Sequence, residues 1–234
     1  MSEAIPWETI EAFLLDLDGT LIETDNRWAE LIAARLTPLK RIFPHLDTNA
    51  LGRKLVMSLE TPTNYIVSFF EHLGLGSSFL GLADRIRRSK GLATKDAVQP
   101  VEGTMYLLKT LASHFKLAIV TTRARPETQA FLRSLGCEQL FEAVITRQDV
   151  LRMKPHPEPI RKAAALLRVP TQHCVMVGDT AMDILSARRA GAYAIGVLSG
   201  FGMHDELKRA GAQLILNSAV EILNYLPTTS LKSH

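Results

Sequence analysis

The stretch AFLLDLDGTLIET, residues 12–24, places two aspartates directly after a run of apolar residues. Such a run is typical of a buried strand, and a buried carboxylate is costly unless it is paired, hydrogen-bonded or bound to a metal. Asp16 and Asp18 are followed at once by Gly19 and Thr20, so packing alone explains them poorly. The pattern indicates either a strand that ends in solvent or a strand that delivers two carboxylates to a functional site.

The composition is that of a soluble globular protein. The chain has 234 residues, 47% hydrophobic and 22% charged, which is enough for one large domain or two small ones. The N-terminal residues lack the pattern of a signal peptide, and the apolar runs are too short to span a bilayer. Cys137 and Cys174 lie among apolar neighbours and predict no disulfide framework. We therefore expect a cytoplasmic protein without a membrane partner.

The charge pattern argues against a nucleic-acid partner. The formal net charge is +3, and the densest basic cluster, DRIRRSKGLATK at residues 84–95, has no interleaved aromatic residues. A solvated helix face is the expected role of this cluster, and a field that attracts a small anionic substrate is the alternative. The sequence carries no signal for the oligomeric state.

Short apolar runs alternate with helical patterns along most of the chain. The runs span residues 12–18, 115–122, 142–146, 173–179, 192–200 and 212–217. Most are apolar throughout, as strands covered on both faces are. Helical patterns such as residues 125–136 and 157–169 have a proline near the start and a glycine or proline near the end. The alternation predicts an α/β fold with a doubly wound parallel sheet, whose ligands bind at the carboxyl ends of the strands.

One segment breaks this alternation. From about residue 23 to residue 96 the sequence shows successive amphipathic helical patterns and no convincing strand. We predict an α/β core domain at residues 1–22 and 97–234, with an inserted α-helical cap domain at residues 23–96.

Residues with reactive or charged side chains follow several of the predicted strands. Because the carboxyl ends of parallel strands lie on one edge of the sheet, these residues should converge. Carboxylates are ligands that Mg²⁺ prefers, a lysine adds positive charge, and a threonine hydroxyl with nearby N–H groups can hold phosphate oxygens. Together they suit phosphoryl transfer through an aspartyl-phosphate. The set comprises Asp16, Asp18, Thr121, Thr122, Lys154, Asp179 and Asp183.

These residues lie in four ordered motifs: DLDGTL at 16–21, IVTT at 119–122, KPHPEP at 154–159 and GDTAMD at 178–183. On these motifs the sequence resembles the haloacid dehalogenase superfamily of phosphohydrolases. The helical insertion resembles the cap of the subgroup that includes phosphoglycolate phosphatases and β-phosphoglucomutases. The resemblance implies a Rossmann-like core, a phosphatase activity and Mg²⁺ as cofactor.

The resemblance also implies roles for the first motif. Asp16 would be the nucleophile and a metal ligand. Asp18 would be the general acid and later the base, and its backbone carbonyl would bind the metal. On an extended strand, positions two apart face the same way, so one carboxylate can attack phosphorus while the other reaches the ester oxygen. Gly19 lets the chain turn sharply and leaves room for the phosphate.

In the other motifs, the resemblance implies that Thr121 hydrogen-bonds the transferring phosphoryl group and that Thr122 assists through its backbone. Many relatives have Asn where this chain has Thr122. Lys154 would neutralise the charge of the nucleophile and of the phosphate. Asp179 would bind the metal, and Asp183 would bind it through water or orient its neighbours.

We therefore expect hydrolysis of a small phosphomonoester, phosphoglycolate-like or a sugar phosphate, by an enzyme that works on a small phosphorylated metabolite. A phosphomutase of the same fold is the alternative. A 2-haloacid dehalogenase is disfavoured, because the position of Asp18 is not an aspartate in those enzymes. A non-catalytic binding protein is disfavoured by the intact set of acids and lysine. Arg123 and Arg125 are expected to be loop residues, with substrate contact as the alternative.

Overall fold

The structure is a computed structural model that describes residues 4–23 and 99–227. The chain divides into two compact units, Met1–Glu23 with Asp96–His234, and Thr24–Lys95. Apart from Glu23, the predicted cap domain at residues 23–96 lies outside the described residues, so its helices and its boundaries stay predictions.

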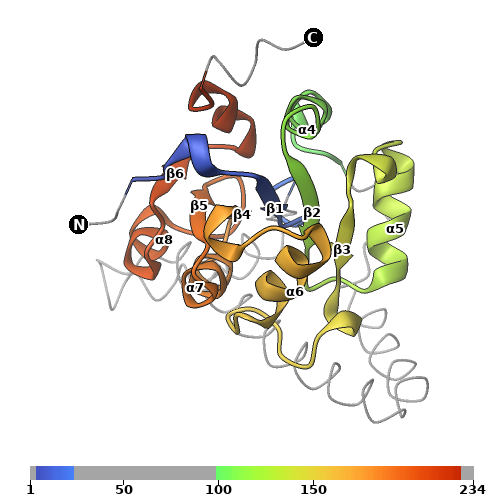
Figure 1. Cartoon of the computed structure of the whole chain (residues 1–234). Helices are drawn as coiled ribbons and strands as arrows, with labels where there is room; N and C mark the ends of the chain where they lie inside the picture. The colour runs from blue at the N-terminus through green and yellow to red at the C-terminus, as the bar shows by residue number, and fades with distance from the viewer. Residues whose placement is uncertain (1–3, 24–98, 228–234) are drawn as a thin grey trace, which may run out of the picture. The chain divides into compact units, whose positions relative to one another are not determined.

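A parallel sheet forms the centre of the described unit (Figure 1). Its six strands lie side by side in the order β3-β2-β1-β4-β5-β6, and every neighbouring pair is parallel. This confirms the predicted doubly wound α/β fold. The strand order reverses between β1 and β4, which is where such sheets bind their ligands. The strands are β1 (Ala12–Leu15), β2 (Lys116–Val120), β3 (Ala143–Ile145), β4 (Cys174–Gly178), β5 (Tyr193–Val197) and β6 (Leu214–Leu216).

Helices connect the strands. The predicted helices at residues 125–136 and 157–169 are confirmed as α5 and α6, each slightly shorter than predicted. In the described part of the chain, no helix is long and apolar enough to cross a membrane. The α-helices are α4 (Thr104–Ala112), α5 (Arg125–Ser134), α6 (Glu158–Leu167), α7 (Ala181–Ala190) and α8 (His204–Ala210). The 3-10 helices are η1 (Trp7–Thr9), η3 (Glu138–Leu140), η4 (Arg147–Asp149), η5 (Thr171–His173) and η6 (Ala219–Asn224).

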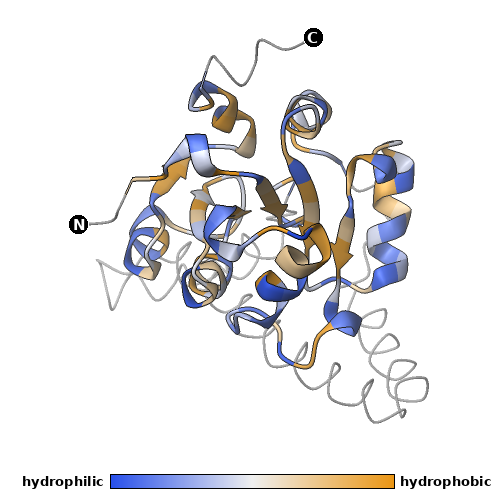
Figure 2. Cartoon of the chain, in the orientation of Figure 1, coloured by the Kyte–Doolittle hydropathy of each residue, from blue (hydrophilic) through white to orange (hydrophobic). Residues whose placement is uncertain are grey.

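Both faces of the sheet are covered, which explains why the strand sequences do not alternate. On β1, Phe13 and Leu15 point into a core that α4, α5 and η6 complete. Ala12 and Leu14 point into the opposite core, against α6, α7 and α8. Figure 2 shows the strands as apolar, with polar residues on the outer faces of the helices. Burial on both faces of the sheet holds the strand ends in a fixed register.

Candidate active site

The chain leaves β1 in a tight turn. β1 ends at Leu15, so the prediction of one extended strand through Asp18 is wrong. The Asp16 N–H still bonds to the Val177 carbonyl at 3.0 Å, but the Leu17 carbonyl then accepts N–H bonds from three residues of the following turn. Gly19 has φ +70, a conformation that favours glycine.

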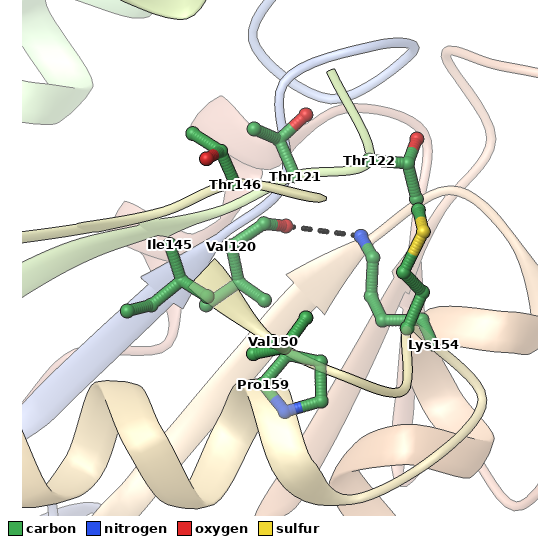
Figure 3. A pocket seen from close by; sticks show the side chains of 9 residues that line it. Val120, Thr121, Thr122, Ile145, Thr146, Val150, Lys154 and Pro159 are labelled. Atoms are coloured by element: carbon green, nitrogen blue, oxygen red, sulfur yellow. Dashed lines mark hydrogen bonds between the residues drawn. The ribbon is translucent and has the colours of Figure 1, made fainter. Parts of the chain in front are cut away.

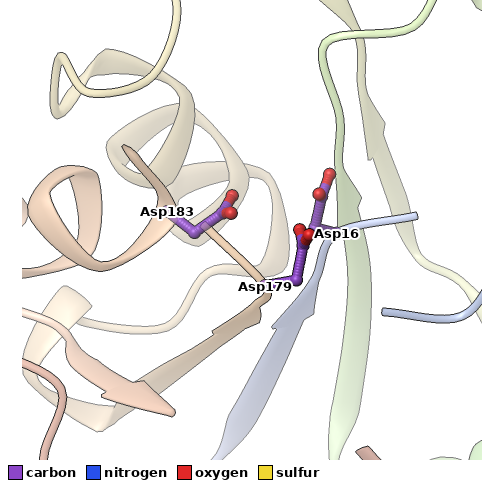
Figure 4. Close-up of side chains that lie close together, drawn as sticks. All are labelled: Asp16, Asp179 and Asp183. Atoms are coloured by element: carbon purple, nitrogen blue, oxygen red, sulfur yellow. The ribbon is translucent and has the colours of Figure 1, made fainter. Parts of the chain in front are cut away.

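Three carboxylates from neighbouring elements meet at this edge of the sheet. Asp16 directly follows β1, Asp179 directly follows the adjacent strand β4, and Asp183 lies in the first turn of α7. All three are buried, and one oxygen from each lies within 4.8 Å of the others (Figure 4). The structure therefore brings together three of the four predicted metal-ligand residues through their side chains.

Lys154 reaches into this acid cluster from the loop before α6. Its Nζ lies 2.9 Å from Asp16 Oδ1 and also contacts Asp183 Oδ1. It donates a further bond to the Val120 carbonyl at the end of β2, at 3.0 Å (Figure 3). The lysine is buried, so its charge acts on the acids with little screening by water.

The electrostatics of the cluster follow from its burial. Burial raises the pKa of Asp16 to about 7, although the charge of Lys154 acts in the opposite direction. Burial, together with the charges of Asp183 and Asp16, raises the pKa of Asp179 well above its usual range. Burial alone would lower the pKa of Lys154, but its two carboxylate partners raise it above its ordinary value. Three carboxylates face one lysine, and a divalent cation would balance the remaining negative charge.

The carboxylate of Asp183 is held on both oxygens. Thr180 donates its N–H and its hydroxyl to Asp183 Oδ2, at 3.1 and 2.6 Å, in a capping box that starts α7. Asp183 Oδ1 contacts Lys154. A Cβ at Gly178 would lie 2.3 Å from Asp183 Cγ, so only glycine fits at the end of β4. This arrangement suits the orienting role that the sequence left open for Asp183.

A loop after β5 holds Asp179, and the sequence analysis did not assign it a role. The Phe201 N–H donates to Asp179 Oδ2 at 2.8 Å, and the Ser199 hydroxyl donates to the Gly19 carbonyl at 2.6 Å. A Cβ at Gly200 would lie 1.9 Å from Asp179 Oδ2. The sequence places this loop at the same edge of the sheet as the acids, because Gly200 ends the predicted strand at residues 192–200 and Gly202 follows it, but it does not reveal the contacts with Asp179 and Gly19.

Asp18 lies apart from the buried acids, in an ion pair that the sequence analysis missed. Arg123 Nε donates to Asp18 Oδ2 at 2.7 Å, and Arg123 Nη2 donates to Asp18 Oδ1 at 2.5 Å. The Arg123 and Asp18 side chains are 26% and 41% exposed. Burial acts to lower the pKa of Arg123, but the hydrogen bonds and charge of Asp18 raise it above its usual value. Arg125 instead pairs with Asp149 at 2.6 Å and bonds to the Val144 carbonyl.

The two threonines follow β2, next to Lys154. The Thr121 backbone N–H donates to the Ile145 carbonyl at 2.9 Å. The Thr121 hydroxyl accepts a hydrogen bond from the backbone N–H of Arg123 at 3.1 Å. A cavity of about 10 Å³, the size of one water molecule, lies beneath them (Figure 3). It is too small for a substrate. Its walls are Val120, Thr121, Thr122, Ile145, Thr146, Val150, Met153, Lys154 and Pro159.

Comparisons with known proteins agree with this architecture. The profile of the haloacid dehalogenase-like hydrolases matches residues 13–197. Pyrophosphatase PpaX of Anoxybacillus flavithermus is 32% identical over 94% of this chain and 99% of the relative. Phosphoglycolate phosphatase of Colwellia psychrerythraea is 27% identical over 91% of this chain and 95% of the relative. A solved haloacid dehalogenase-like protein of Streptococcus pneumoniae shares the fold, with a TM-score of 0.65 and 24% identity over 94% of this chain and all of that one.

Proposed function

Because the chain belongs to the haloacid dehalogenase-like hydrolases, we propose that it is a Mg²⁺-dependent phosphatase of small phosphomonoesters that works through an aspartyl-phosphate on Asp16. One observation carries the proposal. The Asp16 carboxylate lies 2.9 Å from a buried lysine and within 4.8 Å of two further buried carboxylates. A nucleophile, a fixed positive charge and metal-binding oxygens therefore occupy one end of the sheet.

In the first step, an Asp16 oxygen attacks the phosphorus of the substrate and the ester bond breaks. Asp18 gives its proton to the departing oxygen, which leaves as an alcohol. In the second step, Asp18 takes a proton from a water molecule that attacks the phosphorus, and the bond from phosphorus to Asp16 breaks. Phosphate leaves, and Asp16 and Asp18 return to their starting states.

The other residues stabilise the transferred phosphoryl group. The Thr121 hydroxyl and the backbone after it would donate to the phosphoryl oxygens, and Lys154 would balance their charge. Lys154 is suited to this because its contacts with Asp16 and Val120 fix its ammonium group at the site. Thr122 would contribute through its backbone, and Gly19 leaves the space that a side chain would fill.

The donor set fits Mg²⁺, a hard cation that takes oxygen ligands. Asp16, Asp179 and the backbone carbonyl of Asp18 would hold it, and Asp183 would act through water or by orienting its neighbours. When bound, the metal supplies positive charge next to the transferred phosphoryl group. The acid cluster supports this assignment, because its oxygens lie within 4.8 Å of one another.

The names of the relatives support a substrate class. A pyrophosphatase and a phosphoglycolate phosphatase, by their names, act on small phosphorylated compounds. We propose a small phosphorylated metabolite, phosphoglycolate-like or a sugar phosphate. Action in the cytoplasm fits the buried Cys137 and Cys174, neither of which forms a disulfide.

The test is phosphate release from p-nitrophenyl phosphate and from a panel of phosphorylated metabolites, with Mg²⁺ or with EDTA, for the wild type and Asp16→Asn. We expect turnover that needs Mg²⁺ and falls by about 10⁴-fold or more in the variant, since the nucleophile is lost. Phosphoryl transfer between two positions of a substrate would indicate the mutase instead. Halide release from 2-haloacids would indicate a dehalogenase, and no turnover by folded protein would indicate a binding role.

A further inference from the structure

We propose that Arg123 binds a second anionic group on the leaving-group side of the substrate. The preferred substrates are then phosphate esters or anhydrides whose leaving group carries another anion close to the bridging oxygen. This inference rests on the proposed function and narrows its substrate class. Phosphoglycolate and pyrophosphate belong to the class, whereas a sugar phosphate whose leaving group is neutral does not.

The geometry of the ion pair between Arg123 and Asp18 suits the binding of another anion. Arg123 Nε and Nη2 form a two-pronged contact with the two oxygens of Asp18, at 2.7 and 2.5 Å. A planar guanidinium binds a carboxylate or a phosphate in the same bidentate way. Within the described part of the chain, Arg123 Nη1 has no hydrogen-bond partner. The guanidinium can therefore bind a further anion through Nη1. Such an anion can also replace Asp18 as the bidentate partner.

The ion pair is also accessible to a ligand. The Arg123 side chain is 26% exposed and that of Asp18 is 41% exposed, so a ligand can reach the pair. By contrast, the Lys154 side chain is 4% exposed and is enclosed by Asp16 and Asp183. The two cations therefore differ in role. Lys154 serves the transferred phosphoryl group, and Arg123 is left for another part of the substrate.

The contact with Asp18 also places Arg123 on the leaving-group side of the reaction. Asp18 must reach the bridging oxygen of the ester, and Arg123 contacts Asp18 directly. The Arg123 N–H also bonds to the Thr121 hydroxyl, at 3.1 Å, which ties its backbone to the phosphoryl side of the site. A group attached to the bridging oxygen by a few bonds thus comes close to the guanidinium. The guanidinium attracts this group if it is negatively charged. If the group is neutral, Arg123 stays paired with Asp18.

Replacement of Asp18 on Arg123 by an anion of the substrate also assists catalysis. While Arg123 holds both Asp18 oxygens, each oxygen uses one of its acceptor positions on the guanidinium, so Arg123 competes with the substrate for Asp18. When an incoming anion pairs with the guanidinium, Asp18 is released and can contact the bridging oxygen. Binding of the second anion therefore favours both substrate affinity and the departure of the leaving group.

The test compares 2-phosphoglycolate with ethyl phosphate, which has the same two carbons but no carboxylate. For the wild type, we expect kcat/KM with 2-phosphoglycolate to be about 100-fold higher, the scale of one charge-assisted contact. In Arg123→Gln we expect this ratio to fall at least tenfold. Arg123→Lys, which keeps the charge and loses the planar fork, should give an intermediate ratio. In Arg123→Gln, kcat/KM for pyrophosphate should fall in parallel with kcat/KM for 2-phosphoglycolate.

Arg125→Gln is the matched control, because Arg125 follows two residues later and pairs with Asp149 instead. The ratio of kcat/KM for 2-phosphoglycolate to kcat/KM for ethyl phosphate should be the same in Arg125→Gln as in the wild type. An equal loss on both substrates in Arg123→Gln would overturn the inference, since Arg123 would then act only through Asp18. Equal turnover of both substrates by the wild type would also overturn it. Failure to hydrolyse any phosphate ester would instead contradict the proposed function itself. Thermal unfolding of each variant separates these outcomes from loss of folding.

Discussion

Two ion pairs at the carboxyl edge of the sheet differ in nearly every physical respect. The ion pair of Lys154 and Asp16 is buried, with side chains 4% and 10% exposed, and it belongs to a cluster with further acids. Arg123 with Asp18 is 26% and 41% exposed and joins no other acid by hydrogen bond in the described chain. The buried pair is locked in place by the fold, whereas the half-exposed pair can exchange partners. On this difference we propose that the buried pair serves the nucleophilic step, and that the exposed pair serves proton transfer through Asp18 and the choice of leaving group through Arg123.

The energetics of burial support this division. Removing one partner of a buried pair leaves an uncompensated charge in the interior, at a cost of about 3–5 kcal/mol. An exposed pair contributes about 0–1 kcal/mol to stability, because water screens it. Changes on the buried side should therefore affect both folding and the reaction, and changes on the exposed side should affect mainly the reaction.

After loss of the Asp16 nucleophile itself, the largest effect is expected for Lys154→Met. This change removes the only cation that contacts Asp16 within the described residues and leaves the buried acids without compensation. We expect kcat to fall by about 10³-fold and the free energy of unfolding to fall by about 3 kcal/mol. Steady-state kinetics and thermal unfolding measure the two effects. Lys208→Met, at an exposed position of α8, is the control and should change neither. A variant that keeps a tenth of the activity would contradict this account.

A selective effect is expected for Asp18→Asn. The variant cannot donate a proton, so kcat/KM for ethyl phosphate should fall by about 10³-fold. p-Nitrophenolate departs without a proton, so kcat/KM for p-nitrophenyl phosphate should fall by only about tenfold. Both values come from initial rates over a range of substrate concentrations. If the two substrates lose activity equally, Asp18 does not act on the leaving group.

A smaller effect is expected for Gly200→Ala, because the added Cβ would lie 1.9 Å from Asp179 Oδ2 and would displace that carboxylate. The Mg²⁺ concentration for half-maximal activity should rise by about 10-fold, as it does when groups that orient metal ligands are changed. The measurement is a Mg²⁺ titration of activity. Gly136→Ala is the control, since a Cβ at that glycine meets nothing within 4 Å, although its φ is +62. An unchanged titration in Gly200→Ala would mean that this loop does not position Asp179.

The smallest effect is expected for Thr122→Asn. Thr122 would act through its backbone, so the change should alter kcat/KM for p-nitrophenyl phosphate by less than about threefold. The same assay applied to Thr121→Val should show a loss of about 10-fold or more, because a hydroxyl aimed at the phosphoryl group is removed. Similar losses in both variants would show that the Thr122 side chain takes part in catalysis.

The sequence predicted the sheet well, because burial on both faces leaves a clear pattern. Phe13 and Leu15 face one core, and Ala12 and Leu14 face the other, so the whole strand is apolar. It also predicted that residues from separate motifs would converge, since parallel strands end on one edge. The strand end was placed too late, because the turn at Leu17 depends on hydrogen bonds that apolar periodicity does not report.

The exposed pair could not be predicted in the same way. Arg123 and Asp18 are 105 residues apart, and only the pairing of β1 with β2 brings them together. A long side chain in a loop has many conformations, so its partner depends on coordinates and not on periodicity. The contacts of Ser199 with Gly19 and of Gly200 with Asp179 also depend on the coordinates, because the sequence places Ser199 and Gly200 only at the end of a predicted strand.

The most direct test of the central claim is pre-steady-state release of p-nitrophenolate by Asp18→Asn. This leaving group needs no acid, whereas the second step needs Asp18 as base, so the phosphorylated enzyme should accumulate. The account predicts a burst of one equivalent of p-nitrophenolate per active site, and a phosphoryl group on the peptide that contains Asp16. Steady turnover without a burst, and with Asp16 unmodified, would contradict it.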